Sequence, residues 1–121
     1  MLYTDKITIG GKEYGVAYCY ATEVGFASIT GKDISTIKWE EGGGQYVVSL
    51  IIAAVYAYYD KDQKESPITD REVLYNATKT ELVKAFETIW KMALKWNELP
   101  PLEAKAAKAE QAAEGDQEGD K

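Results

Sequence analysis

The chain has 121 residues, with 14 Lys and Arg against 20 Asp and Glu, and a net charge of −6 at pH 7. It has no histidine and a single cysteine, which excludes Ser-His-Asp and Cys-His catalysis, histidine metal sites and an intrachain disulfide. Its acidic balance, with basic residues scattered among acids, argues against a nucleic-acid binder, and no run of about 18 apolar residues predicts a membrane span.

These totals predict one small domain in a reducing compartment. A chain of this length can bury a single core. Its first residues lack the basic-then-apolar order of a signal peptide. We therefore expect a soluble, cytoplasmic, non-enzymatic protein with no catalytic residues, no cofactor, no metal and no membrane or nucleic-acid partner.

The N-terminal sequence predicts a β-hairpin. Residues 4–9 and residues 12–20 each alternate with a period of two, and Gly10-Gly11 between them is a favoured pair for a two-residue turn that needs positive φ. A turn there places Ile7 opposite Tyr14, so that the apolar faces of both strands coincide. The second strand's apolar face comprises Tyr14, Val16, Tyr18 and Tyr20. Because a lone hairpin is marginal in water, it must lie on helices or on another subunit, and its outer edges could accept a further strand.

A short helix is predicted after the hairpin. Thr22 is expected to cap it, with Gly31 in the left-handed position just past its end. Cys19, which has no histidine partner in this chain, is interpreted as an inert strand cysteine. The apolar contacts of this helix are assigned to Val24, Phe26, Ala27 and Ile29, and Trp39 in the following connection is interpreted as part of the core.

The most apolar stretch is YVVSLIIAAVYAYY, residues 46–59, in which Ser49 alone is plainly polar. A helix that is hydrophobic all round is either a membrane span or the buried centre of a domain. Such a helix would rise about 21 Å, against about 30 Å for a bilayer hydrocarbon core. We therefore predict a buried central helix without a solvent face, preceded by a flexible hinge at residues 42–44. A buried strand is the alternative, because several residues of the stretch are β-branched.

Two capping boxes, Thr69 with Glu72 and Thr78 with Glu81, predict the starts of two further helices. The first should run through about Asn76 and the second through about Asn97. The second carries a broad apolar stripe, expected to pack on the central helix, that comprises Leu82, Val83, Phe86, Ile89, Trp90, Ala93, Leu94 and Trp96.

The composition changes after the second helix. From Leu102 onward the chain has six acids, three bases and no further large apolar residue, so it cannot bury enough surface to offset its ordering entropy. The prediction is an α+β fold. Residues 1–100 form a single domain, an N-terminal β-hairpin packed on about four helices with a buried central helix, and residues 101–121 form a disordered acidic tail.

The N-terminal motifs also resemble a known family. KITIGGKEY at residues 6–14 leads into an alternating strand, followed by ATEVGF at residues 21–26 and ITGKD at residues 29–33. In this order the motifs resemble small tail-assembly proteins of siphophages and prophages, especially those of gut Bacteroidetes. The likeness covers roughly residues 6–37, and beyond them only the layout matches: a buried helix, a loop, a terminal helix and a charged tail.

The resemblance implies a tail assembly chaperone. Proteins of this kind are acidic and non-catalytic, and they coat the long, largely helical tape-measure protein before the tail tube forms around it. Many are made in two lengths by a ribosomal frameshift near the end of the shorter form, and the sequence AKAAK at residues 104–108 would sit near that point. The family has no catalytic motif, so the resemblance transfers no site residues.

A chaperone of this kind is expected to bind its partner protein and to oligomerise along it. The sequence offers two candidate surfaces for this binding. They are the hairpin face with Tyr14, Val16 and Tyr18, and the terminal helix with Phe86, Trp90 and Trp96. Both sets also have a structural interpretation, in which the hairpin simply covers the helices and the tryptophans complete the core. The alternative functions are a structural phage tail or connector subunit, a regulatory protein-binding domain and, least favoured, an enzyme.

Overall fold

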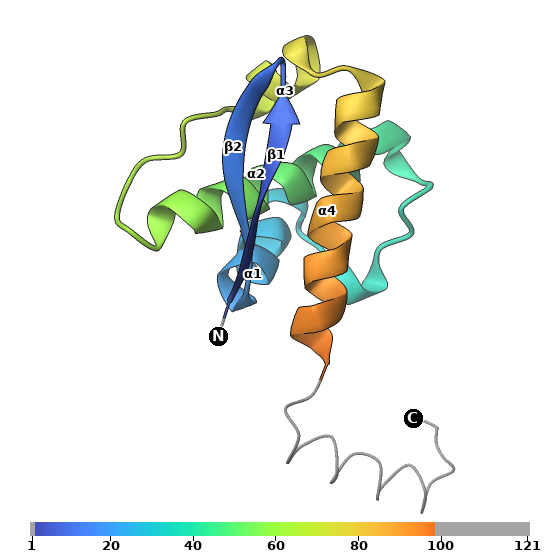
Figure 1. Ribbon diagram of the computed structural model, residues 1–121. Coiled ribbons are helices and arrows are strands. Elements are labelled where there is room, and N and C mark those ends of the chain that lie inside the picture. The colour runs from blue at the N-terminus through green and yellow to red at the C-terminus, as the bar shows by residue number, and fades with distance from the viewer. Residues whose placement is uncertain (1, 99–121) are drawn as a thin grey trace, which may run out of the picture.

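The computed structural model describes residues 2–98 as a two-stranded antiparallel hairpin packed on four α-helices (Figure 1). This arrangement confirms the predicted α+β class, with the hairpin at the N-terminus and the apolar helix in the centre. The predicted tail, residues 101–121, lies outside the described residues. None of the described helices is long and apolar enough to cross a bilayer.

The hairpin consists of β1 (Tyr3–Ile9) and β2 (Lys12–Tyr18), and Ile7 pairs with Tyr14 as predicted. Gly10 and Gly11 both have positive φ, 61° and 78°, which suits the two-residue turn. The prediction that β2 extends to Tyr20 is wrong. The strand ends at Tyr18, and Tyr20 begins a helix with 69% of its surface exposed.

The first helix, α1 (Tyr20–Thr30), is capped differently from the prediction. Its N-cap is Cys19, so the interpretation of Cys19 as a strand residue is also wrong. Thr22 lies three residues later, fully buried, where its hydroxyl accepts a hydrogen bond from Cys19 N (3.2 Å) and donates one to Ala17 O (2.8 Å). Gly31 ends the helix with φ 73°, as predicted.

The prediction that Val24 and Ile29 of α1 make apolar contacts with the core is wrong. Phe26 is fully buried, but Val24 and Ile29 are each 51% exposed, because a helix presents only one stripe to the core. Two 3₁₀ turns, Ile34–Thr36 and Gly42–Gly44, then lead to the central helix. The segment predicted as a flexible hinge is therefore a defined turn, in which Gly42, Gly43 and Gly44 all have positive φ.

The central helix, α2 (Gln45–Asp60), crosses behind the hairpin (Figure 1), and the alternative of a buried strand is wrong. Most of its middle is buried, namely Ser49, Leu50, Ile51, Ala53, Ala54, Val55 and Ala57. The expectation that it has no solvent face holds only for this middle. Tyr56, near its end, is 52% exposed, since the phenol tolerates water at its polar tip.

Both capping boxes and both helix ends are confirmed in α3 (Asp70–Asn76) and α4 (Lys79–Asn97). The stripe predicted for α4 is too wide. Its buried residues are Ala85, Ile89, Met92 and Ala93, whereas Val83, Trp90 and Leu94 are exposed by 50%, 38% and 55%. The hairpin packs against α4, so the buried face of α4 includes Ala85 and Met92, which the sequence pattern did not single out.

Candidate protein-binding groove

An apolar groove of about 800 Å³ lies where the end of α1, the start of α2, α3 and the start of α4 meet. Its α2 side is formed by Val48 and Ile52, one helical turn apart. Val73 of α3 and Leu82 of α4, which come later in the sequence, also line the groove. The groove is therefore assembled from segments that lie far apart in the sequence.

The glycine turn before α2 forms one end of this groove. Gly43 and Gly44 line the groove, and a Cβ atom added to either would meet nothing within 4 Å. Their φ angles of 61° and 90° are strained for most side chains, which explains why glycine is used here. The turn thus lets backbone, rather than side chains, form this end of the groove.

The rim of the groove carries large apolar side chains that face water. Ile29 of α1 is 51% exposed and Leu74 of α3 is 60% exposed. Scattered single apolar residues are normal on a surface, but these two line the same apolar hollow and add to its exposed apolar surface. Exposed apolar surface of this kind is typical of sites that bind another protein.

The polar groups of the groove are few, and most already have partners. The hydroxyl of Ser49 is buried and donates to Gln45 O (2.9 Å). Asp70 is the one charged residue in the lining, and its carboxylate accepts a hydrogen bond from Arg71 N (2.9 Å). The lining is therefore mostly apolar and suits an apolar surface of another molecule.

Three of the residues predicted to bind a partner lie in the core of the described fold. Tyr14, Val16 and Tyr18 are 8%, 0% and 1% exposed, because α2 and α4 cover the face on which they lie. The Tyr18 hydroxyl donates to the Glu23 carboxylate (2.9 Å), and burial followed by this hydrogen bond raises the pKa of Tyr18 far above its ordinary value. A partner cannot reach these side chains in this fold.

The three predicted residues of α4 separate into two groups. Phe86 and Trp90 stack with ring centroids 5.7 Å apart, and Trp39 meets both rings edge-on at 5.1 and 5.9 Å. Trp96 instead packs against Tyr18 at 5.8 Å, on the hairpin side of the helix. Only Trp90 presents a substantial exposed surface, so Phe86 and Trp96 serve mainly as packing residues.

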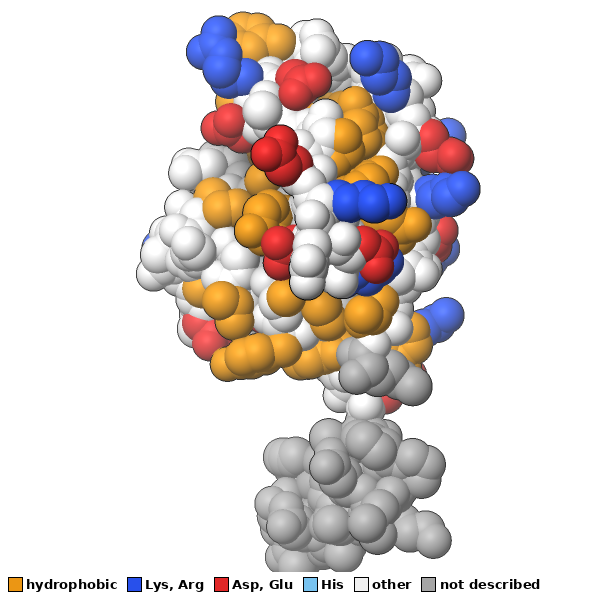
Figure 2. Space-filling model, turned by 90° about the vertical axis from the view of Figure 1, so that its left-hand side faces the viewer, with side chains coloured by type: hydrophobic (Ala, Val, Ile, Leu, Met, Phe, Trp, Pro, Cys, Tyr) orange, Lys and Arg blue, Asp and Glu red, His pale blue; other side chains and the backbone are white. Residues whose placement is uncertain are grey.

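Figure 2 shows the face on the β2 side of the molecule, where hydrophobic side chains lie in groups interrupted by charges of both signs. Within residues 2–98, no group of three or more His, Cys, Asp or Glu side chains is placed to hold a metal ion.

The sequence did not predict the groove, because its lining residues come from several elements and no single element carries the pattern. The available signal for the groove was a pair of apolar residues, Ile29 and Leu74, on two short helices. Helices of this length have too few turns for their apolar pattern to show which face is buried. Comparison of the chain with protein-family models, with curated proteins and with solved structures gives no match.

Proposed function

We propose that this chain is a non-catalytic tail assembly chaperone whose groove holds an amphipathic helix of a phage tape-measure protein. The observation that carries the proposal is the apolar groove with its exposed rim of Ile29 and Leu74. An amphipathic helix that lays its apolar face into such a groove is a recurring mode of protein recognition. The motifs at residues 6–33 supply the link to tail assembly.

The dimensions of the groove suit a short length of helix. A helix about 10 Å in diameter, embedded to half its depth, occupies about 40 Å² of cross-section, so about 800 Å³ corresponds to about 20 Å or three to four turns. One molecule would cover only this length. A tape-measure protein is much longer, so many copies would bind along it in the host-cell cytoplasm, each kept from aggregating by its net charge of −6.

The alternatives fit the structure less well. A tail-tube or connector subunit normally needs a larger sheet, and the described residues form only a two-stranded one. A regulatory protein-binding domain could use the same groove, and it differs from the proposal in the identity of its partner.

The test is co-expression of the full chain with a phage tape-measure protein, followed by affinity purification. Ile29→Asp and Leu74→Asp place charge on the rim and should lower recovery of the tape-measure protein at least tenfold. Leu94→Asp is the matched control, because Leu94 is similarly exposed, at 55%, but does not line the groove. Equal recovery with all three variants, or stoichiometric amounts of this chain in purified virions, would contradict the proposal.

A further inference from the structure

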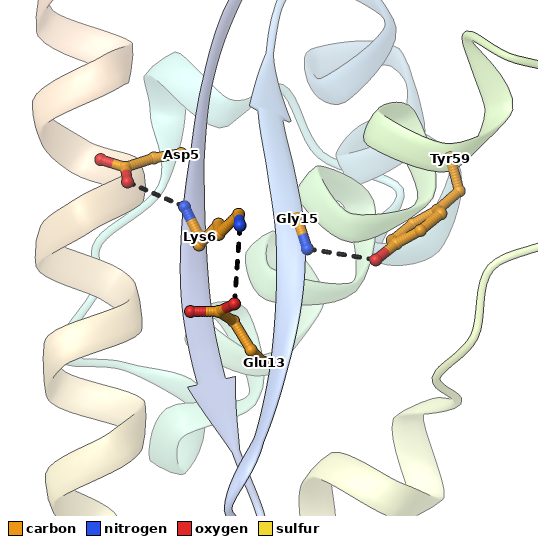
Figure 3. A network of polar contacts seen from close by, with 5 residues as sticks. All are labelled: Asp5, Lys6, Glu13, Gly15 and Tyr59. Atoms are coloured by element: carbon orange, nitrogen blue, oxygen red, sulfur yellow. Dashed lines mark hydrogen bonds and ion pairs between the residues drawn. The ribbon is translucent and has the colours of Figure 1, made fainter.

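A second groove, lined by four lysines, runs between β1 and α4. It consists of two adjoining hollows of about 410 and 360 Å³ that share Thr88. Within the described residues β1 pairs only with β2, so its other edge is unpaired. Figure 3 shows the backbone nitrogen of Lys6 pointing away from β2 toward α4, where the Asp5 carboxylate accepts its hydrogen bond at 2.8 Å.

The lining of this groove is basic although the chain as a whole is acidic. Lys84, Lys91 and Lys95 line it from α4, and Lys6 lines it from β1. Spacings of seven and four residues place the three α4 lysines along one side of the helix over about 16 Å. Within residues 2–98 none of these three lysines makes an ion pair, while Lys6 lies 3.6 Å from Glu13.

The acids of the groove are already engaged. Asp5 accepts the backbone N–H of Lys6, and Glu81 accepts those of Gly10 and Gly11 at 2.8 and 3.0 Å. Their charges are thus directed at backbone donors, and the lysines remain available for an added acidic ligand. A basic strip of this kind complements an acidic peptide segment.

We infer that the acidic segment at residues 110–120 of the same chain binds along this basic groove. The segment has five acids and no base: Glu110, Glu114, Asp116, Glu118 and Asp120. Its reach is sufficient. Lys84 lies about 21 Å along the helix from Glu98, whereas the intervening residues 98–110 can span up to about 40 Å when extended. The segment is covalently attached beside the groove, so its effective concentration there is in the millimolar range.

This contact would add to the cover that α4 already gives the unpaired edge of β1. Unpaired strand edges are templates for pairing with other chains, and natural proteins often protect them with charge or with a covering segment. An attached acidic segment does both, and a more acidic partner or high salt can displace it. The inference does not depend on the tail assembly function, because it concerns a different groove.

The test compares amide NMR spectra of the full chain with those of the quadruple variant Glu114→Gln, Asp116→Asn, Glu118→Gln, Asp120→Asn. At 10 mM NaCl the two proteins should differ at the amides of Thr4, Lys6, Thr88 and Lys91. The differences should fall at least fivefold in 1 M NaCl, because the Debye length shrinks from about 30 Å to about 3 Å.

Charge reversal on the body provides the matched comparison. Lys84→Glu with Lys91→Glu should abolish the spectral effect of neutralising the segment, and circular dichroism checks that the variant still folds, since both lysines are exposed. Lys38→Glu with Lys64→Glu makes the same charge change elsewhere and should leave the effect intact. Absence of the effect at low salt, its persistence in 1 M NaCl, or its growth with protein concentration, which would indicate a second copy, each overturns the inference.

Discussion

The carboxylate of Glu81, at the start of α4, accepts a hydrogen bond from the backbone N–H of Gly10 at 2.8 Å, although the two residues are 71 positions apart. Its second oxygen accepts from Gly11 at 3.0 Å, and the first oxygen also accepts from Thr78 N at 3.0 Å. One side chain therefore caps α4 and fastens the hairpin turn to it. A capping box is a local device, but here it also fixes a contact between two distant elements.

Replacing this carboxylate should loosen the hairpin. Glu81→Gln keeps the size of the side chain but replaces one acceptor oxygen with a donor and removes the charge that strengthens these hydrogen bonds. We expect a lower melting temperature and faster hydrogen exchange at Gly10 and Gly11. Glu87→Gln, an exposed substitution on the same helix, is the control and should change both much less. Equal effects of the two substitutions would show that the bridge to the turn contributes nothing measurable.

The same contacts should make stability depend on pH. Hydrogen bonds from the N–H groups of Thr78, Gly10 and Gly11 lower the pKa of Glu81 below its ordinary value of 4.5. A carboxyl whose pKa is lowered by folding contributes stability that is fully present above its unfolded pKa and is lost as the pH falls through its folded pKa. The urea midpoint of the wild type should therefore drop more between pH 5 and pH 3 than that of Glu81→Gln. Parallel pH profiles would rule out this linkage.

Exposure along α4 can be tested by truncating two β-branched residues of one helix. Ile89 is fully buried, and Ile89→Ala should lower the free energy of unfolding by about 2–5 kcal/mol through lost burial and a residual cavity. Val83 is 50% exposed, and Val83→Ala should change it by less than about 0.5 kcal/mol. Urea unfolding measures both. A large loss from Val83→Ala would mean that Val83 is covered in solution.

The sequence determined the local elements well because their signals are local. The Gly10-Gly11 turn has two residues, which leaves one register that aligns the apolar faces and so pairs Ile7 with Tyr14. The capping boxes likewise predicted the starts of α3 and α4. The Thr69 hydroxyl accepts a hydrogen bond from Glu72 N, and the Thr78 hydroxyl accepts one from Glu81 N.

The sequence did not determine which elements cover one another. The apolar stripe of α4 spans more than half of the helix, so periodicity alone could not show that Ala85 would be buried and Leu94 exposed. That choice depends on where the hairpin docks. The same lack of long-range information hid the groove, and it made buried Tyr14 and Tyr18 look like a surface for a partner.

A close contact with α2 favours glycine at position 15 of β2. A Cβ atom on Gly15 would lie 2.4 Å from the Tyr58 ring, and the Gly15 N–H donates to the Tyr59 hydroxyl at 3.2 Å (Figure 3). Gly15→Ala should therefore lower the free energy of unfolding by about 1–3 kcal/mol, the usual range for overpacking. The clash is with one ring, so Gly15→Ala should cost less in a Tyr58→Ala background, which a double-mutant cycle in urea measures. If the two losses simply add, strain against Tyr58 is not the reason that glycine is needed at this position.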